Sequence, residues 1–367
     1  MKKEDSRCRV AAVFTAAALA LLFAACGEGD KGKGAAPEPG GAKKTERAPA
    51  PVKEVTLTLA GYTTPREAYG KAIIPAFQKH WMEKTGQKVA FQESYLGSGA
   101  QSRAVAGGFE ADVVALSLAP DVQRLVDAGL IDAKWDQRPD NGMVSRSIAV
   151  LAVRPGNPKG IKDWEDLGRA DVEVLTPNAK TSGGAMWNVL AMYGAAMRGH
   201  VASAKAGDVE SAKALLAKVL ARVTIMDKGA RESMLTFEKG VGDVAITYEN
   251  EVLVGNKSGA KYDYVVPAST LLIENPIAVV DKYADKHGTR EVATAFVEFT
   301  KLPEQQRAFG EYGLRPVDAA VAAEVEAKLP KVADLFTIRD LGGWPEMIAK
   351  VFGDTGIYSQ VVASLGR

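Results

Sequence analysis

Cysteine is almost absent from this sequence, and histidine is scarce. The 367-residue chain has two cysteines, Cys8 and Cys26, and three histidines, His80, His200 and His287. The histidines are far apart and lack the spacing of metal ligands, so we predict neither a metal site nor a cofactor. Cys8 lies in a segment that we expect to be removed. Cys26 would then be the only cysteine, which excludes an intramolecular disulfide.

An excess of charge of either sign is missing as well. Lysine and arginine number 46 against 45 aspartates and glutamates, a formal net charge of +1. This balance argues against nucleic acid as a partner and against broad binding to a membrane surface. With 47% hydrophobic residues, the chain can bury a large core, and its length suggests two domains.

Residues 1–25 have the pattern of a signal peptide. A basic start is followed by an apolar run, 10–25, that is too short to span a membrane comfortably. The small residues before Cys26 resemble the bacterial lipoprotein signal, in which that cysteine becomes the lipid-modified first residue. Phe23 stands where that signal prefers leucine. Simple secretion, with cleavage near Ala25, is the alternative.

Residues 26–53 are rich in glycine, alanine, proline, lysine and glutamate and show no periodicity. This composition predicts a disordered tether. Together with lipidation of Cys26, it predicts a protein on the periplasmic or extracytoplasmic face that touches the membrane only through its lipid anchor.

Strand-like runs alternate with helical spacing through the rest of the chain. We predict strands at 54–60, 89–93, 111–116, 147–154, 172–175, 223–226 and 244–248, and helices that include 65–85, 203–220 and 290–301. This alternation predicts an α/β fold with parallel sheets, which bind ligands at the carboxyl ends of their strands. Thr64, Pro65 and Glu67 have the spacing of a capping box at a helix start.

One turn stands out, Lys180-Thr181-Ser182-Gly183-Gly184-Ala185, between a strand-like run and a helical one. The first N–H groups of a helix have no partner within it and carry partial positive charge. Two glycines allow a ligand to approach the backbone closely. Loop, hydroxyl and helix start therefore form a candidate anion site. The alternative is that Ser182 is an ordinary N-cap and the glycines only make a turn.

Similar turns occur at Ser98 and Ala230, and Thr63-Thr64 makes a fourth without glycine. Each lies between a predicted strand and a predicted helix. Four helix starts could therefore be directed at one point between two lobes, and this coincidence is more specific than any single motif.

These residues resemble the sulfate-binding proteins of bacterial ABC uptake systems over about residues 55–344. The shared stretches are Gly97-Ser98-Gly99, Gly108-Phe109-Glu110-Ala111-Asp112, Trp164-Glu165-Asp166-Leu167, Thr176-Pro177-Asn178, Ser182-Gly183-Gly184-Ala185, Trp187-Asn188, Gly229-Ala230-Arg231, Gly242-Asp243-Val244, Glu249-Asn250-Glu251, Leu314-Arg315-Pro316 and Leu335-Phe336-Thr337-Ile338.

The resemblance implies a two-lobed periplasmic-binding-protein fold of type II with the ligand cleft between the lobes. Lobe I would comprise 54–150 plus 268–367, and lobe II 151–267. It also implies a monomer that captures one oxyanion and delivers it to the permease subunits of an ABC transporter.

The resemblance further implies which residues hold the anion. Backbone N–H groups would come from Thr63, Ser98, Gly183, Gly184 and Ala230, and Ser182 would add its hydroxyl. Thr63 replaces an aspartate of close relatives. Tyr248 stands where a typical member has tryptophan, so a phenol that can also accept a hydrogen bond replaces an indole donor.

The ligand expected from this chemistry is sulfate or thiosulfate, because a dianion without a proton suits a site made only of donors. Hydrogen phosphate is the alternative, with Asp227 or Glu249 accepting its proton, although a structural role is the favoured interpretation of Glu249. A serine hydrolase with Ser182 or Ser98 as nucleophile is a further alternative. Neither serine lies in a G-x-S-x-G motif and no histidine lies in a motif that could provide a base, so we predict that the protein is not an enzyme.

Overall fold

A computed structural model describes residues 53–366 of the chain. The predicted signal peptide 1–25, the lipidation site Cys26 and the predicted tether, apart from Lys53, lie outside the described residues. Among the helices of the described part, none is both long enough and apolar enough to cross a membrane.

Ten strands form one sheet. They are β1 (Glu54–Tyr62), β2 (Lys88–Leu96), β3 (Val113–Ala115), β4 (Met143–Val153), β5 (Val174–Leu175), β6 (Val223–Ile225), β7 (Val244–Tyr248), β8 (Asp263–Val265), β9 (Ser269–Val279) and β10 (Asp334–Phe336).

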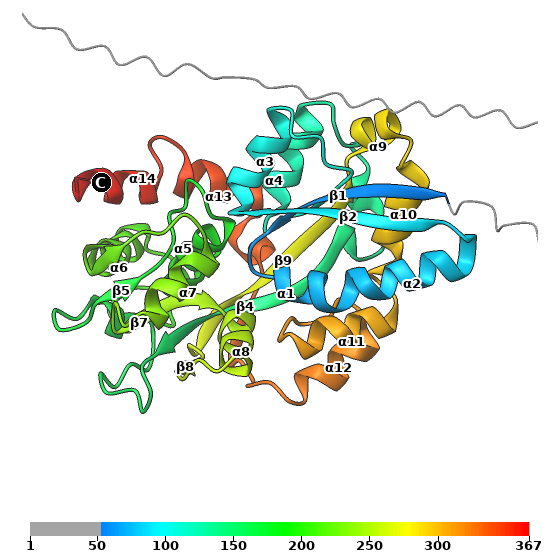
Figure 1. Cartoon of the computed structure of the whole chain (residues 1–367). Coiled ribbons are helices and arrows are strands. Elements are labelled where there is room, and N and C mark those ends of the chain that lie inside the picture. The colour runs from blue at the N-terminus through cyan, green and yellow to red at the C-terminus, as the bar shows by residue number, and fades with distance from the viewer. Residues whose placement is uncertain (1–52, 367) are drawn as a thin grey trace, which may run out of the picture. The chain divides into compact units, whose positions relative to one another are not determined.

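Helices connect and cover these strands (Figure 1). The α-helices are α1 (Arg66–Ala68), α2 (Ile74–Thr85), α3 (Ser98–Ala106), α4 (Ala119–Asp127), α5 (Gly183–Met197), α6 (Val209–Ala221), α7 (Ala230–Glu238), α8 (Glu249–Lys257), α9 (Asp281–His287), α10 (Arg290–Phe299), α11 (Pro303–Glu311), α12 (Ala319–Glu326), α13 (Trp344–Met347) and α14 (Ile357–Ser364).

The strand order is β2-β1-β3-β9-β4-β7-β5-β6, with β8 beside β4 and β10 beside β9. Strands β1, β2 and β3 are parallel to one another, and so are β5, β6 and β7. The predicted α/β class is therefore confirmed. The prediction of parallel sheets is wrong for β4 and β9, which run antiparallel to β7, β3 and each other. A run of buried apolar residues does not encode strand direction.

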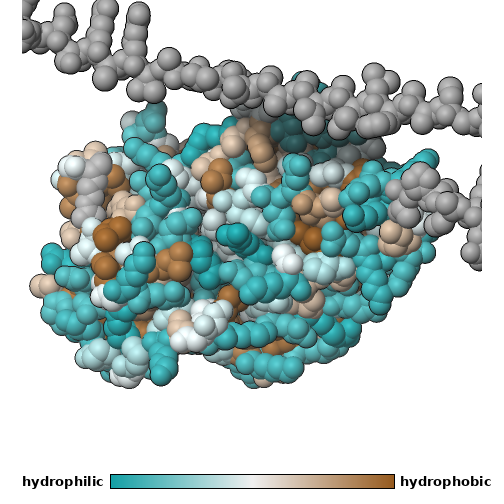
Figure 2. All heavy atoms as spheres, viewed as in Figure 1, coloured by the Kyte–Doolittle hydropathy of each residue, from teal (hydrophilic) through white to brown (hydrophobic). Residues whose placement is uncertain are grey.

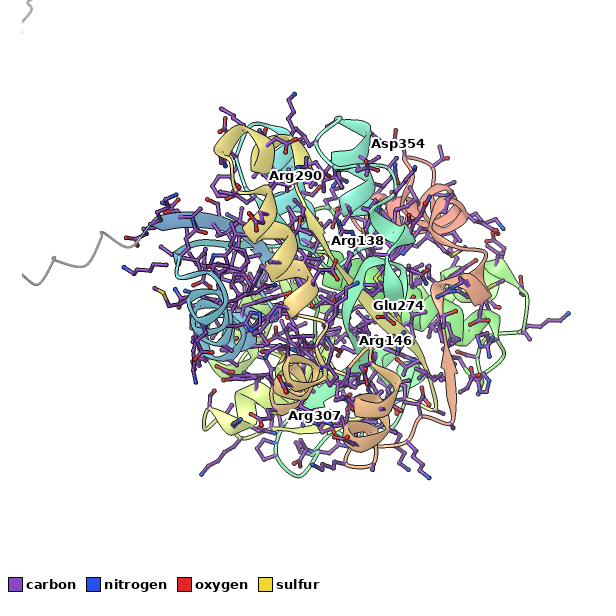
Figure 3. The ribbon with its side chains drawn as sticks, turned by 90° about the vertical axis from the view of Figure 1, so that its right-hand side faces the viewer. Arg138, Arg146, Glu274, Arg290, Arg307 and Asp354 are labelled. Carbon is purple, nitrogen blue, oxygen red and sulfur yellow. The ribbon has the colours of Figure 1, made fainter. Side chains whose placement is uncertain are left out.

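The two antiparallel strands β4 and β9 are each 11 residues long and join the two parallel groups. Figure 1 shows them passing between the part that contains α2, α10 and α11 and the part that contains α5, α6 and α7. Arg146 of β4 and Glu274 of β9 are cross-strand partners, and both are labelled in Figure 3. Because these strands continue from one part into the other, they connect the two parts by backbone rather than by a flexible linker.

Each part has its own apolar core. In the first part, Phe77 of α2 packs with Leu57 of β1 and Phe296 of α10. In the second part, Leu190 of α5 and Leu216 of α6 belong to another buried cluster. Figure 2 shows a mostly hydrophilic face with apolar residues scattered among the polar ones. The periodic apolar residues have thus gone into the two cores, as expected for amphipathic helices on a sheet.

The last helices of the chain pack on the second part. Met347, Val351 and Tyr358 share the buried cluster of α5 and α6. The ring of Trp344 meets that of Trp187 edge-on, with their centroids 4.7 Å apart. The C-terminal segment is therefore fixed to the elements that hold the central glycine-rich turn.

Candidate ligand-binding site

Three helix starts meet where the sequence places its glycine-rich turns. Helix α3 begins at Ser98, α5 at Gly183 and α7 at Ala230. The Ala100 N–H donates to the Thr181 carbonyl at 3.3 Å, which joins the starts of α3 and α5. A Cβ on Gly97 would lie 2.7 Å from the Thr181 oxygen and 2.8 Å from that of Lys228. The three loops thus approach so closely that Gly97 has no room for a side chain.

The glycines of the central turn also lie against the other predicted residues. A Cβ on Gly184 would be 3.2 Å from Ala230 Cβ, 3.4 Å from Ser182 Oγ and 3.4 Å from Tyr248 Cε1. A Cβ on Gly183 would be 2.7 Å from Ser117 Oγ. The structure therefore brings Ser182, Gly183, Gly184, Ala230 and Tyr248 together.

Thr63 lies at the same place, directly after β1. Its Oγ1 is 3.6 Å from the Cβ position of Gly229, the residue before α7. The predicted capping box beside it does not form. Pro65 occupies the N-cap position, and no side chain of the described residues caps the start of α1. Glu67 instead pairs with Arg231 Nη2 at 2.9 Å, so a tertiary contact has replaced the local one.

Backbone donors are available at these helix starts. Within residues 53–366, the N–H groups of Ser98, Gly183, Gly184 and Ala230 donate to no backbone carbonyl. The helix cannot supply partners to its own first N–H groups, and these groups carry its positive partial charge. All four residues are buried. Buried donors without acceptors are costly, so the arrangement favours a bound acceptor.

The Ser182 hydroxyl caps α5, and it still has a hydrogen to donate. Its Oγ accepts from the Ala185 N–H at 3.3 Å. Among the described residues, no acceptor takes the Ser182 hydroxyl hydrogen, although the side chain is only 3% exposed. The N-cap interpretation and the ligand interpretation are therefore compatible, because they use different sides of the same oxygen.

Ser98 contrasts with Ser182, since its hydroxyl is already engaged. Ser98 Oγ donates to Asp121 Oδ2 at 2.6 Å and accepts from the Ser117 N–H at 2.9 Å. Asp121 in turn receives Arg124 Nη1 at 2.8 Å. Ser98 can thus offer a ligand its N–H group but not its hydroxyl.

Tyr248 ends β7 and is fully buried. Its hydroxyl is 2.7 Å from Ser117 Oγ, and its ring centroid is 6.4 Å from that of Tyr62. Burial raises the pKa of Tyr248 well above its ordinary value, against the opposing hydrogen bonds of Ser117 and Asn275. The phenol therefore keeps its proton at neutral pH and can act as a donor.

Arg231, which follows Ala230 at the start of α7, is paired with carboxylates. It contacts Glu67 and lies 3.1 Å from Glu251 Oε2. Its side chain is only 18% exposed. Burial raises the pKa of Glu251 to about 7, and the neighbouring Arg231 acts against this rise. Arg231 therefore adds no unpaired positive charge at the start of α7.

Glu249 and Asp227 differ in their surroundings. Glu249 is fully buried and holds Arg315 through two hydrogen bonds, of 2.8 and 3.1 Å. The structural interpretation of Glu249 is confirmed, and its carboxylate is occupied. Asp227 accepts from Thr236 at 3.1 Å, while its second oxygen is buried and has no partner within residues 53–366.

The histidines lie against other groups. His200 Nε2 is 3.3 Å from Asp334. His287 lies between Glu110 and Asp112, and the His80 ring is 5.0 Å from that of Phe299. In the part of the chain that the structure covers, no three acidic, histidine or cysteine side chains are arranged to hold a metal ion.

Sequence reasoning missed Ser117, Asp121, Asn275 and the Glu249–Arg315 pair. Ser117 directly follows the strand-like run 111–116, so the rule that ligands lie at the carboxyl ends of strands could have indicated it. The other three depend on contacts between residues far apart in the sequence, for which no local pattern exists.

Two α/β parts joined by long crossing strands, with helix starts that meet between them, define the type II fold of periplasmic binding proteins. The chain belongs to the bacterial extracellular solute-binding protein family, whose model matches residues 57–315.

Several characterised proteins are similar to this chain over most of their length. The sulfate-binding protein of Synechococcus elongatus is 45% identical over 309 residues, which is 84% of this chain and 86% of the relative. The thiosulfate-binding protein of Escherichia coli is 35% identical, over 85% of this chain and 93% of the relative. The solved structure of the sulfate-binding protein SubI from Mycobacterium tuberculosis has a TM-score of 0.75 at 38% identity, and covers 81% of this chain and 99% of SubI.

Proposed function

We propose that this protein binds sulfate or thiosulfate outside the cytoplasm and delivers it to the permease subunits of an ABC transporter. The observation that carries this proposal is the set of backbone N–H groups without a carbonyl acceptor at Ser98, Gly183, Gly184 and Ala230. Thr63 would add an N–H group, and Ser182 and Tyr248 would add hydroxyl donors. Relatives that bind sulfate and thiosulfate support the same ligand class.

The electrostatics of the site support a dianion without a proton. Several N–H dipoles can spread two negative charges without a buried lysine or arginine. Arg231 is engaged with Glu67 and Glu251, so its charge is already balanced. Hydrogen phosphate would need an acceptor for its proton. The carboxylate of Glu249 is held by Arg315, whereas one oxygen of Asp227 has no partner among the described residues. Sulfate needs no acceptor and therefore fits the donor set directly, while phosphate would depend on Asp227.

A binding role is also favoured over a hydrolytic one. A serine nucleophile needs a base within hydrogen-bond reach. The Ser98 hydroxyl is bonded to Asp121, and His200 and His287 are engaged with carboxylates elsewhere. We therefore infer that the bound anion leaves unchanged.

We further propose that lobe I comprises 54–150 plus 268–367 and that lobe II comprises 151–267. The two lobes would close on the ligand by bending where the crossing strands leave lobe II. Helices α13 and α14 are the exception within 268–367, because they pack in the core of α5 and α6 and would therefore move with lobe II. Cys26 would carry the lipid anchor, and the tether that follows it would keep the monomer beside its permease.

Calorimetric titration of the protein tests this function. Sulfate, thiosulfate, phosphate and molybdate are titrated alone and in competition. We expect one-to-one binding, with sulfate or thiosulfate the tightest ligand and no chemical change of the anion. Binding of phosphate in preference to sulfate would shift the assignment to the alternative ligand. Absence of binding to all four anions would contradict the proposal.

A further inference from the structure

Ser117 connects the elements that form the candidate site. It is fully buried and lies two residues after the end of β3. Its N–H donates to Ser98 Oγ at 2.9 Å, and its hydroxyl lies 2.7 Å from that of Tyr248. Its carbonyl accepts from Trp187 Nε1 at 2.9 Å and from Asn275 Nδ2 at 3.2 Å. One residue thus links the start of α3 to α5, β7 and the crossing strand β9.

The orientation of the Asn275 amide is determined by these contacts. A carbonyl oxygen can only accept, so the group that faces the Ser117 carbonyl must be the NH₂ of Asn275. The amide oxygen of Asn275 accepts from Ser145 Oγ at 3.4 Å. Asn275 Nδ2 and the Tyr248 hydroxyl therefore both contact Ser117, the first at its carbonyl and the second at its hydroxyl. Asn275 fixes the backbone of Ser117, from which the Ser117 hydroxyl reaches the phenol oxygen.

We propose that Ser117, together with Asn275, holds the Tyr248 hydroxyl as a donor toward the bound oxyanion. The Ser117 hydroxyl donates to the phenol oxygen and fills an acceptor position of that oxygen, so the phenol hydrogen is directed to the ligand. Ser117 is then a positioning residue that determines specificity. The inference rests on the proposed function, because it requires an oxyanion at the helix starts beside Tyr248.

The consequence concerns which tetrahedral anions the site accepts. A phenol oxygen that already accepts from Ser117 offers the ligand its hydrogen, as an indole N–H does. Sulfate can accept that hydrogen. Hydrogen phosphate carries a proton of its own and finds no acceptor at Tyr248, so it leaves a buried donor unpaired. Without the Ser117 hydroxyl, the phenol oxygen regains an acceptor position and this discrimination weakens.

Ser117→Ala tests the inference through a ratio of affinities. Dissociation constants for sulfate and for inorganic phosphate are measured by calorimetry at alkaline pH, where phosphate is a dianion with one proton. We expect the sulfate-over-phosphate preference of Ser117→Ala to fall about fivefold or more, the effect of one hydrogen bond. Ser117→Cys keeps most of the side-chain volume but donates weakly, and it should lower the ratio as well.

Two further variants separate positioning from general destabilisation. In a Tyr248→Phe background, Ser117→Ala should leave the ratio unchanged, since there is no phenol to orient. Ser269→Ala removes an equally buried hydroxyl on β9, which is bonded to Asp334. This variant should also leave the sulfate-over-phosphate ratio unchanged. If Ser117→Ala lowers the affinities for sulfate and phosphate equally, the role of Ser117 is only structural and the inference is overturned. A wild-type protein that binds neither anion would instead overturn the proposed function.

Discussion

The hydroxyl of Ser98 donates to Asp121 Oδ2 at 2.6 Å, and this bond fixes the first residue of α3 to the first turn of α4. Both side chains are buried, and Arg124 Nη1 forms an ion pair with Asp121 Oδ1 at 2.8 Å. Because the hydroxyl is engaged, the backbone N–H is what Ser98 can offer a ligand. A carboxylate outside the donor set thus determines the position of one proposed donor.

Asp121→Ala should weaken sulfate binding although Asp121 is not a proposed ligand residue. Loss of the carboxylate leaves the buried Ser98 hydroxyl unpaired and should cost about 1–3 kcal/mol of unfolding free energy. The start of α3 should also become less well positioned, which lowers the affinity. Denaturant unfolding and sulfate calorimetry measure the two effects. Asp127→Ala in the same helix, where the side chain accepts only from the exposed Gln123, is the matched control. Equal affinity in both variants would contradict the positioning role.

Ser182→Ala distinguishes a ligand residue from a helix cap. Removal of a donor to a charged ligand should weaken sulfate binding by about 1–3 kcal/mol. Loss of the cap should also lower the unfolding free energy by about 1 kcal/mol. Asp208→Ala, which removes the N-cap of α6, is expected to reproduce only the second effect. If Ser182→Ala binds sulfate as tightly as wild type does, its hydroxyl is a cap and nothing more.

The helix starts were predictable because their signals are local. Glycine before α3 and α7, and Ser182 before α5, give the boundaries that the structure shows. The same reasoning failed at Thr64, where a capping box matched the spacing but Glu67 pairs with Arg231 of another element. The predicted helix 203–220 begins only at Val209, because Asp208 provides its N-cap.

Contacts between distant residues could not be predicted in this way. The partner of Glu249 is Arg315, 66 positions later, and Ser117 meets Tyr248 across 131 positions. Their geometry depends on the crossing of β4 and β9, and the alternation of strands and helices does not specify that crossing. The site's backbone donors were therefore predictable, whereas the side chains that position them were not.

Tyr248→Trp tests whether Tyr248 occupies the place of the family's tryptophan. The indole N–H should preserve or improve sulfate binding. The larger ring must fit a fully buried site between Ser117 and Gly184, so the single variant should lose about 1–3 kcal/mol of stability by overpacking. Tyr248→Trp combined with Ser117→Ala provides room and should recover part of that loss. Thermal unfolding and calorimetry of both variants report the two effects, and complete loss of sulfate binding in both would show that Tyr248 does not take the place of the family's tryptophan.

Glu251 should make stability depend on pH. Burial raises its pKa from 4.5 to about 7 in the folded protein. Between about pH 4.5 and 7, the folded state therefore binds a proton that the unfolded state has released, and stability falls as pH rises. Glu251→Gln cannot titrate and serves as the reference. As pH rises from about 4.5 to 7, the unfolding free energy of the wild-type protein should fall by about 2–3 kcal/mol relative to that variant. Urea unfolding of both proteins at several pH values measures the difference. A constant difference would show that Arg231 keeps Glu251 ionised throughout.

Lobe closure is expected to bend the crossing strands near Arg154 and Pro267. The Arg154 guanidinium is bonded to the carbonyls of Phe237 and Gly242, at 2.8 and 2.9 Å, so this end of β4 is fixed to the second part. Contacts such as the Trp187–Ser117 bond and the Ala100–Thr181 bond join the two parts and must break on opening. We therefore expect saturating sulfate to reduce the radius of gyration in solution scattering. Chloride at equal ionic strength is the control for salt effects.

Trp187→Phe removes the Trp187–Ser117 bond without changing a proposed ligand residue, and it should make the ligand-free protein more open. Identical scattering with and without sulfate, in a protein that calorimetry shows to bind it, would mean that the lobes do not move.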